Sequence, residues 1–145
     1  MGALLERARV VRERAHAPYS GYRVGAALEA DDGTVYVGCN VENASYGLTI
    51  CAERSATAAA VADGRRRFHR IALVSDGPEP IPPCGACRQV LAEFEPDLEI
   101  VSEAGEERVR WTLGELLPRA FRLSRKAGDG VDAGESDGPP GGGSR

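Results

Sequence analysis

The sequence has no long apolar segment, and this absence limits where the protein can work. Its 145 residues contain no run of about eighteen apolar residues, the length that a membrane-spanning helix needs. The first residues also include no apolar stretch of the kind that directs secretion. We therefore expect a cytoplasmic chain with no membrane partner. In that reducing compartment, clustered cysteines bind metals or act in catalysis more often than they form disulfides.

Basic residues are fewer than acidic ones. The chain has 18 Lys and Arg residues against 22 Asp and Glu residues, which gives a net charge of -4 and a pI of about 5.3. A nucleic-acid-binding domain usually carries a basic stripe. The one dense basic run, at residues 65–67, is interpreted as a solvated turn after a helix rather than a phosphate-binding patch. We therefore expect no nucleic-acid partner.

No internal repeat is present, and the length suits one domain with a hydrophobic core. Apolar periodicity and turn residues predict helices over residues 3–15, 50–63 and 84–94, and strands over residues 23–30, 35–41, 70–75, 98–101 and 109–111. The sequence Thr112-x-x-Glu115 is a capping box that predicts a short last helix. This order of elements predicts an α/β fold with one sheet of about five strands covered by helices.

The composition changes near the C-terminus. Residues 127–145 are dominated by Gly, Pro, Ser and Asp, and Val131 is their only large apolar side chain. Such a segment cannot bury enough apolar surface to offset the loss of chain entropy on folding. We therefore expect a folded domain over residues 1–124 and a disordered tail over residues 125–145.

Three of the four cysteines stand in two short motifs, each at the start of a predicted helix. Cys51 and Glu53 form a Cys-x-Glu motif, and Cys84 and Cys87 form a Pro-Cys-x-x-Cys motif. A helix N-terminus favours the thiolate form of a cysteine. If the two helix starts converge, the three thiolates can bind one Zn²⁺ ion. A zinc site with three protein ligands keeps a fourth position open for chemistry, whereas a site with four protein ligands is structural.

The fourth cysteine, Cys39, makes a closed four-cysteine site the alternative. Side chains alternate along a strand, so Asn40 and Glu42 share one face and Cys39 lies on the other. If Asn40 and Glu42 face a pocket, Cys39 therefore points away from it as a buried thiol. This argument favours the open site.

Two charged residues, Glu53 and Arg54, stand two and three positions after Cys51. Glu53 alone could be a first-turn glutamate that the helix dipole favours. Beside an open zinc position, its carboxylate can move protons between water, a ring nitrogen and a departing amine, as hydrolytic deamination requires. Arg54 is either an ordinary exposed helix residue or a donor to the ligand sulfurs that offsets their negative charge.

Five segments, in order and at matching spacing, resemble the small homotetrameric cytidine deaminases. They are Tyr-Ser-Gly-Tyr-Arg-Val-Gly-Ala-Ala-Leu at 19–28, Gly-Cys-Asn-Val-Glu-Asn-Ala-Ser-Tyr-Gly-Leu at 38–48, Cys-Ala-Glu-Arg at 51–54, Pro-Cys-Gly-Ala-Cys-Arg-Gln-Val at 83–90 and Leu-Leu-Pro-Arg-Ala-Phe at 116–121. The resemblance implies a three-layer α/β/α sandwich with a five-stranded mixed sheet. It also implies a homotetramer, with one zinc per chain, that deaminates cytidine and 2′-deoxycytidine to the uridine products and ammonia in pyrimidine salvage.

The resemblance also implies a role for each matching residue. By motif position these are Cys51, Cys84 and Cys87 as zinc ligands, Glu53 as the proton shuttle to a zinc-activated water, Asn40 and Glu42 at the ribose hydroxyls, the Ala52 N–H at the pyrimidine carbonyl, Tyr22 on the pyrimidine ring, and Tyr46 and Phe121 near subunit boundaries, where they help complete a neighbour's pocket. The family usually has Phe where Tyr22 stands, and an ordinary core aromatic is the alternative for Phe121.

Three other functions compete with this one. Blasticidin S deaminase shares the zinc motifs but lacks the Asn-Val-Glu-Asn-Ala-Ser-Tyr-Gly segment that this chain has at residues 40–47. Polynucleotide deaminases usually begin their motif with His-x-Glu and need a basic channel. A non-catalytic, zinc-stabilised oligomer or binding module would have no need of Glu53. The intact motifs therefore favour a nucleoside deaminase.

Overall fold

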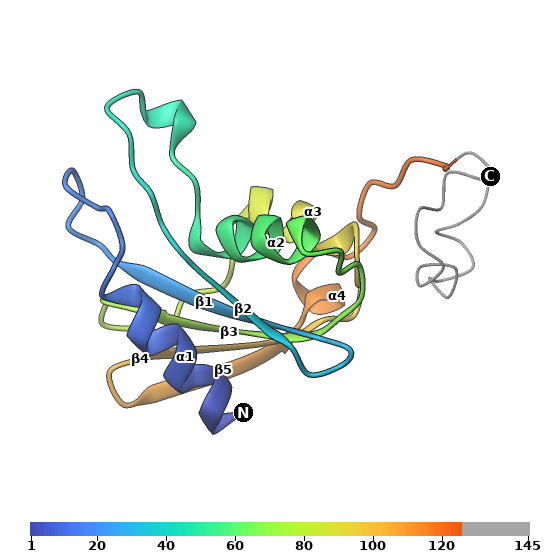
Figure 1. Cartoon of the computed structure of the whole chain (residues 1–145), viewed down its shortest axis with the longest axis horizontal. Coiled ribbons are helices and arrows are strands. Elements are labelled where there is room, and N and C mark those ends of the chain that lie inside the picture. The colour runs from blue at the N-terminus through green and yellow to red at the C-terminus, as the bar shows by residue number, and fades with distance from the viewer. Residues whose placement is uncertain (126–145) are drawn as a thin grey trace.

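A computed structural model describes residues 1–125 of the chain (Figure 1). The tail expected over residues 125–145 lies, from residue 126 onward, outside the described residues. Within the described part, no helix is both long enough and apolar enough to cross a membrane.

Five strands form one mixed sheet. They are β1 (Val24–Ala30), β2 (Val35–Cys39), β3 (Phe68–Ser75), β4 (Glu99–Ala104) and β5 (Glu107–Thr112), and their order in the sheet is β2-β1-β3-β4-β5. The β3–β4 pair is parallel, and the other pairs are antiparallel. β1 and β2 form an antiparallel hairpin, and Gly33 in its turn has a φ of 92°. The mixed five-stranded sheet is therefore confirmed.

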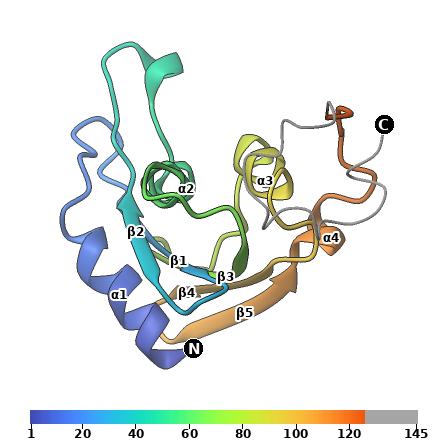
Figure 2. The ribbon, with the colours of Figure 1, turned by 45° about the vertical axis from the view of Figure 1, so that its right-hand side comes forward.

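Helices cover both faces of this sheet (Figure 2). The helices are α1 (Gly2–Arg12), α2 (Ala52–Ala62), α3 (Gly85–Ala92) and α4 (Leu113–Leu116), and a 3-10 helix, η1, spans Tyr46–Leu48. α1 packs its Leu4, Leu5 and Ala8 on one face. α2 and α3 pack on the other face through a separate cluster that includes Ala56 and Leu91. The three-layer α/β/α arrangement is therefore confirmed.

Several element bounds differ from the sequence prediction by a few residues, and two differences affect the surroundings of the site. α1 ends at Arg12 rather than at residue 15. The reason is that the His16 backbone pairs with another segment: its N–H donates to the Asn40 carbonyl at 3.0 Å, and its carbonyl accepts from the Glu42 N–H at 2.8 Å. The second difference is η1, which lies in a segment where the sequence predicts no helix. This segment projects from the sheet between β2 and α2 (Figure 1).

Glycine allows the helices to approach the sheet closely. A Cβ atom on Gly38 of β2 would lie 2.4 Å from the Ala56 nitrogen and 2.7 Å from the Ala52 carbonyl oxygen, both in α2. On the opposite face, a Cβ atom on Gly25 would lie 2.1 Å from the Ala8 carbonyl oxygen of α1. Since real Cβ contacts are never this short, the absence of a side chain at Gly38 sets how near the first turns of α2 come to the sheet.

Candidate active site

The starts of α2 and α3 bring three cysteines together. Cys51 is the N-cap residue of α2, Cys84 is the N-cap residue of α3, and Cys87 lies in the first turn of α3. Their Sγ atoms all lie within 4.8 Å of one another, with 3.9 Å between Cys51 and Cys84 and 3.5 Å between Cys84 and Cys87. Cys87 is buried and Cys84 is exposed, so the cluster reaches the surface.

This sulfur cluster fits a tetrahedral zinc ion. Zinc–sulfur bonds of about 2.3 Å in tetrahedral geometry place the sulfur atoms about 3.8 Å apart. The two Sγ–Sγ distances lie on either side of that value. Thiolate is also a soft ligand of the kind that selects zinc over magnesium or calcium. Cys51, Cys84 and Cys87 could therefore hold zinc with three protein ligands.

Cys39 does not take part in the cluster. It lies directly opposite Gly25 in the β1–β2 register, so its side chain is on the same face of the sheet as the missing Gly25 side chain. That face packs against α1, whereas Cys51, Cys84 and Cys87 belong to the layer on the other side. Burial raises the pKa of the Cys39 thiol. A closed four-cysteine site is therefore not formed by the described residues.

Local interactions favour one thiolate even without a metal. The Cys87 thiol and the Arg54 guanidinium lower the pKa of Cys51 to about 5. The same pairing with Cys51 raises the pKa of Cys87, because Cys87 keeps the shared proton. Arg54 Nη2 lies 3.7 Å from Cys51 Sγ and 3.4 Å from the Thr49 carbonyl oxygen. The structure therefore brings Arg54 to a ligand sulfur rather than leaving it as a solvated helix residue.

Glu53 is buried beside this cluster. Its exposed fraction is 4%, although it lies in the first turn of α2, where glutamates are usually solvated. Burial is the main cause that raises its pKa to about 7, and the negative charge of Cys51 acts in the same direction. A carboxyl group with this pKa both accepts and releases protons near neutral pH, as a general acid–base catalyst must.

Asn40 and Glu42, which are expected to bind the ribose hydroxyls, are hydrogen-bonded to β1 and to the loop that precedes it. Asn40 is 9% exposed; its Oδ1 accepts from the Val24 N–H at 2.9 Å, and its Nδ2 donates to the Tyr22 carbonyl at 2.8 Å. The Glu42 carboxylate accepts from the N–H groups of Tyr19 and Ser20 at 2.9 Å and 3.1 Å, and from the Ser20 hydroxyl. Asn40 and Glu42 therefore both contact the segment that carries Tyr22.

The remaining expected site residues fall into two groups. Tyr22 is half-buried, and a Cβ atom on Gly77 would lie 2.9 Å from its hydroxyl, so its ring lies over the loop after β3. Ala52 is buried at the start of α2, where the N–H groups have no partner within the helix. Tyr46 and Phe121, by contrast, are 75% and 71% exposed in the single chain. The alternative of an ordinary core aromatic is therefore wrong for Phe121.

Sequence reasoning missed three residues that hold these groups in place. The Ser20 hydroxyl contacts Glu42, as described above. Arg88 donates from Nε to the Pro83 carbonyl at 2.7 Å and from Nη1 to the Leu116 carbonyl at 2.9 Å. Gln89 donates to the Phe121 carbonyl at 3.0 Å. All three lie inside the family-like motifs, but neither periodicity nor spacing shows which backbone groups they reach.

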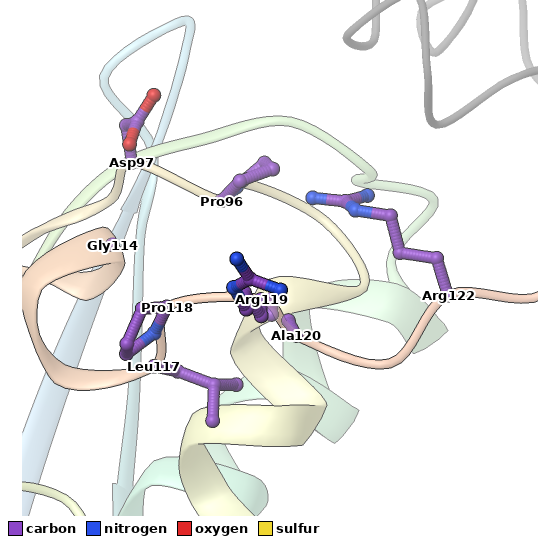
Figure 3. Close-up of a pocket in the computed structure, with 9 residues that line it drawn as sticks. Pro96, Asp97, Gly114, Leu117, Pro118, Arg119, Ala120 and Arg122 are labelled. Atoms are coloured by element: carbon purple, nitrogen blue, oxygen red, sulfur yellow. The ribbon is translucent and has the colours of Figure 1, made fainter.

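A surface pocket of about 270 Å³ is lined by other residues (Figure 3). Its lining comes from the end of α3, the loop that follows, α4 and the segment after α4. The lining residues are Ala92, Pro96, Asp97, Gly114, Leu117, Pro118, Arg119, Ala120 and Arg122. None of them is among the cysteines or the expected substrate contacts, so we assign this pocket no part in the site.

Comparison with known proteins agrees with the geometry. The cytidine and deoxycytidylate deaminase zinc-binding region matches residues 2–103, which include all three clustered cysteines. Cytidine deaminase of Sporosarcina psychrophila is 47% identical over 121 residues, covering 81% of this chain and 88% of the relative. The chain belongs to the cytidine deaminase family. Zinc is therefore the cofactor of this chain, and the cluster of three cysteines could hold it.

Relatives within and beyond the cytidine deaminases differ in how closely they match. The crystal structure of cytidine deaminase from Burkholderia pseudomallei superimposes with a TM-score of 0.79 at 52% identity, covering 83% of this chain and 98% of the other. Blasticidin-S deaminase of Bacillus cereus is 30% identical over 108 residues, covering 69% of this chain and 77% of the relative. The chain is therefore closer to these cytidine deaminases than to this blasticidin-S deaminase.

Proposed function

We propose that the protein hydrolyses cytidine and 2′-deoxycytidine to uridine and 2′-deoxyuridine with release of ammonia. The observation that carries this proposal is the Glu53 carboxyl group, which is buried beside the three-sulfur cluster, two residues after Cys51. A structural zinc site has four protein ligands and needs no buried proton carrier beside it. Hydrolytic deamination requires one.

In the proposed reaction, different residues hold the metal, carry protons and balance the charge of the thiolates. Cys51, Cys84 and Cys87 would hold the zinc ion, which would supply the Lewis acidity needed to activate water for attack on C4 of the pyrimidine. Glu53 accepts a proton from the attacking water and delivers it to N3. It then takes the remaining proton from the hydroxyl group on C4 and passes it to the exocyclic amine, which leaves as ammonia when the C4–N bond breaks and the C4 carbonyl forms. Arg54 donates to Cys51 Sγ and so reduces the negative charge that three thiolates place around the ion.

Four residues bind and orient the nucleoside in this proposal. Asn40 and Glu42 bind the ribose hydroxyls, because an amide and a carboxylate can donate to and accept from them. The Ala52 N–H binds the pyrimidine carbonyl, and the Tyr22 ring packs on the base. Tyr22 keeps the ring face of the usual Phe but adds a hydroxyl, which needs water or a polar partner.

We further propose that the enzyme is a cytoplasmic homotetramer that acts in pyrimidine salvage. The projecting segment between β2 and α2 supports association, since its side chains Val41, Tyr46, Leu48 and Ile50 are 43–75% exposed. Exposed apolar side chains grouped on one segment are typical of an interface. In a tetramer, Tyr46 and Phe121 would help complete the pocket of a neighbouring subunit.

A substrate panel tests the proposal. Zinc-loaded protein is incubated separately with cytidine, 2′-deoxycytidine, cytosine and blasticidin S, and ammonia release is measured. Turnover of the two nucleosides with little turnover of cytosine is the expected result. Turnover of blasticidin S alone would instead identify an analogue deaminase, and no turnover of any compound would favour the zinc-stabilised oligomer.

A further inference from the structure

The loop between α1 and β1 places one hydroxyl between two of the proposed substrate contacts. The Ser20 Oγ donates its hydrogen to Oε2 of Glu42 and accepts from the Tyr22 N–H at 2.9 Å. A serine hydroxyl has one donor, so that donor is committed to the carboxylate. One side chain therefore connects the residue proposed to bind the sugar with the residue proposed to stack on the base.

The other contacts of Glu42 show how little freedom its carboxylate has. Oε1 accepts from the N–H groups of Tyr19 and Ser20, at 2.9 Å and 3.1 Å. An ionised carboxylate has about four acceptor positions, so three protein donors leave about one for a substrate hydroxyl. These donors, the Ser20 hydroxyl first, also lower the pKa of Glu42, which stays an acceptor at neutral pH.

Tyr22 is fixed on both sides of its backbone. Its N–H donates to Ser20 Oγ, and its carbonyl accepts from Asn40 Nδ2 at 2.8 Å. The segment from Tyr19 to Arg23 has no helix or strand of its own. Its position therefore depends on these hydrogen bonds from side chains rather than on a regular backbone ladder.

We propose that Ser20 is a positioning residue that aims Glu42 at a sugar hydroxyl and makes the enzyme selective for nucleosides that carry one. This inference rests on the proposed function, since it assumes that Glu42 binds the sugar. Without the hydroxyl, Oε2 of Glu42 loses its protein donor. The carboxylate is then held only by the two backbone N–H hydrogen bonds to Oε1, so it can change its orientation. A ligand without the 2′- and 3′-hydroxyls does not use Glu42 and is affected less.

Three variants test this proposal in the full-length zinc enzyme. Ser20→Ala removes the hydroxyl, Ser20→Thr retains it, and Thr34→Val removes a hydroxyl from the distant β1–β2 hairpin as the matched control. KM and kcat are measured with cytidine, and 2′,3′-dideoxycytidine is measured as a competitor of cytidine turnover. We expect Ser20→Ala to raise the KM for cytidine about tenfold, as for the loss of a hydrogen bond to a charged group. Affinity for the dideoxy competitor should change by less than about threefold, and Ser20→Thr should recover most of the loss.

A double-mutant cycle separates positioning from a general structural effect. In a Glu42→Ala background, Ser20→Ala should raise the KM for cytidine by less than about threefold, since the group that it positions is absent. Equal losses for cytidine and the dideoxy competitor, full additivity with Glu42→Ala, or no effect of Ser20→Ala would each overturn the proposal. Failure of the wild-type enzyme to deaminate cytidine is a different result, and it would refute the proposed function itself.

Discussion

Glu53 and Cys51 stand two residues apart at the same helix end, yet their pKa values shift in opposite directions. Burial raises the pKa of Glu53 to about 7, while hydrogen bonds from Cys87 and Arg54 lower that of Cys51 to about 5. The helix dipole alone would favour the anion of both groups. The difference therefore arises from burial and specific partners, and it leaves one group suited to bind a metal and the other to carry a proton.

The position of Cys39 leads to a prediction about metal content. Because its side chain faces α1 rather than the sulfur cluster, Cys39→Ala should retain about one zinc per chain and should cost about 1 kcal/mol of stability for the lost packing. Elemental analysis and thermal unfolding measure the two quantities. Cys87→Ala is the matched control that should lose zinc. Loss of zinc from Cys39→Ala would restore the closed four-cysteine site.

The ion pair between Arg23 and Asp76 makes part of the stability of the fold depend on pH. Arg23 hydrogen-bonds the Asp76 carboxylate at 2.8 Å and lowers its pKa. Because the pKa in the folded state lies below that in the unfolded state, this stabilisation is present above the unfolded pKa and is lost as the pH falls through the folded pKa. Asp76→Asn should lower the stability at pH 7 by about 0.5–1 kcal/mol and reduce its further loss below about pH 4.

Denaturant unfolding at several pH values measures this effect. Glu106→Gln, in the turn between β4 and β5, is the control for a simple change in net charge. An unfolding free energy of Asp76→Asn that falls with acid as steeply as the wild type would refute this role of the Arg23–Asp76 pair.

At the scale of elements, the site depends on where α2 and α3 begin. Close contact at Gly38 sets α2 against β2, and Arg88 connects the Pro83 carbonyl, next to Cys84, with the Leu116 carbonyl at the end of α4. The two helix starts are thus fixed by contacts with different elements. Their convergence brings the three sulfur atoms to within 4.8 Å of one another.

Gly38→Ala is the sharpest test of this arrangement. The new methyl group would lie 2.4 Å from the Ala56 nitrogen, a backbone atom that can move only with the whole helix. We expect a loss of about 1–3 kcal/mol in unfolding free energy, with weaker zinc retention on chelator challenge. Gly2→Ala is the control, because a Cβ atom there meets nothing within 4 Å. A Gly38→Ala variant with wild-type stability and zinc retention would contradict the account.

The elements that the sequence predicts well are those that carry their own signals. The two cysteine motifs coincide with helix starts, and Thr112 donates from its N–H to Glu115 at 2.9 Å, as the capping box predicts. The end of α1 could not be predicted, because it depends on the pairing of His16 with a segment more than twenty residues away. For the same reason, the contacts of Ser20 with Glu42 were not visible in local spacing.

At the scale of the whole molecule, the two faces of the sheet carry different groups of side chains. The face toward α2 and α3 carries the sulfur cluster. The face toward α1 carries a row of ion pairs across four strands, in which Arg70 contacts Glu29 at 2.8 Å and Arg110 contacts Glu99 at 2.6 Å. The basic run at residues 65–67 also contributes to folding, since Arg65 pairs with Asp32 at 3.1 Å. These arginines are thus paired with carboxylates of the same chain.

The projecting segment predicts the assembly state. Leu48 is 66% exposed in the single chain, and we expect Leu48→Glu to reduce the molar mass of the purified protein from that of four chains to a smaller species. Light scattering after size-exclusion chromatography measures it. Val10→Glu changes a residue of α1 that is 56% exposed and is the control for an added surface charge. A wild-type protein with the mass of one 15.4 kDa chain would contradict the tetramer.

The most direct test of the open zinc site is a comparison of the zinc-loaded wild type with Glu53→Gln. Zinc per chain, thermal unfolding and the rate of cytidine deamination are measured on the same preparations. We expect about one zinc per chain in both proteins, a folded variant, and a loss of at least about 100-fold in kcat, because Gln is nearly isosteric but cannot carry the proton. A Glu53→Gln variant that keeps zinc and deaminates cytidine at the wild-type rate would contradict this role of Glu53.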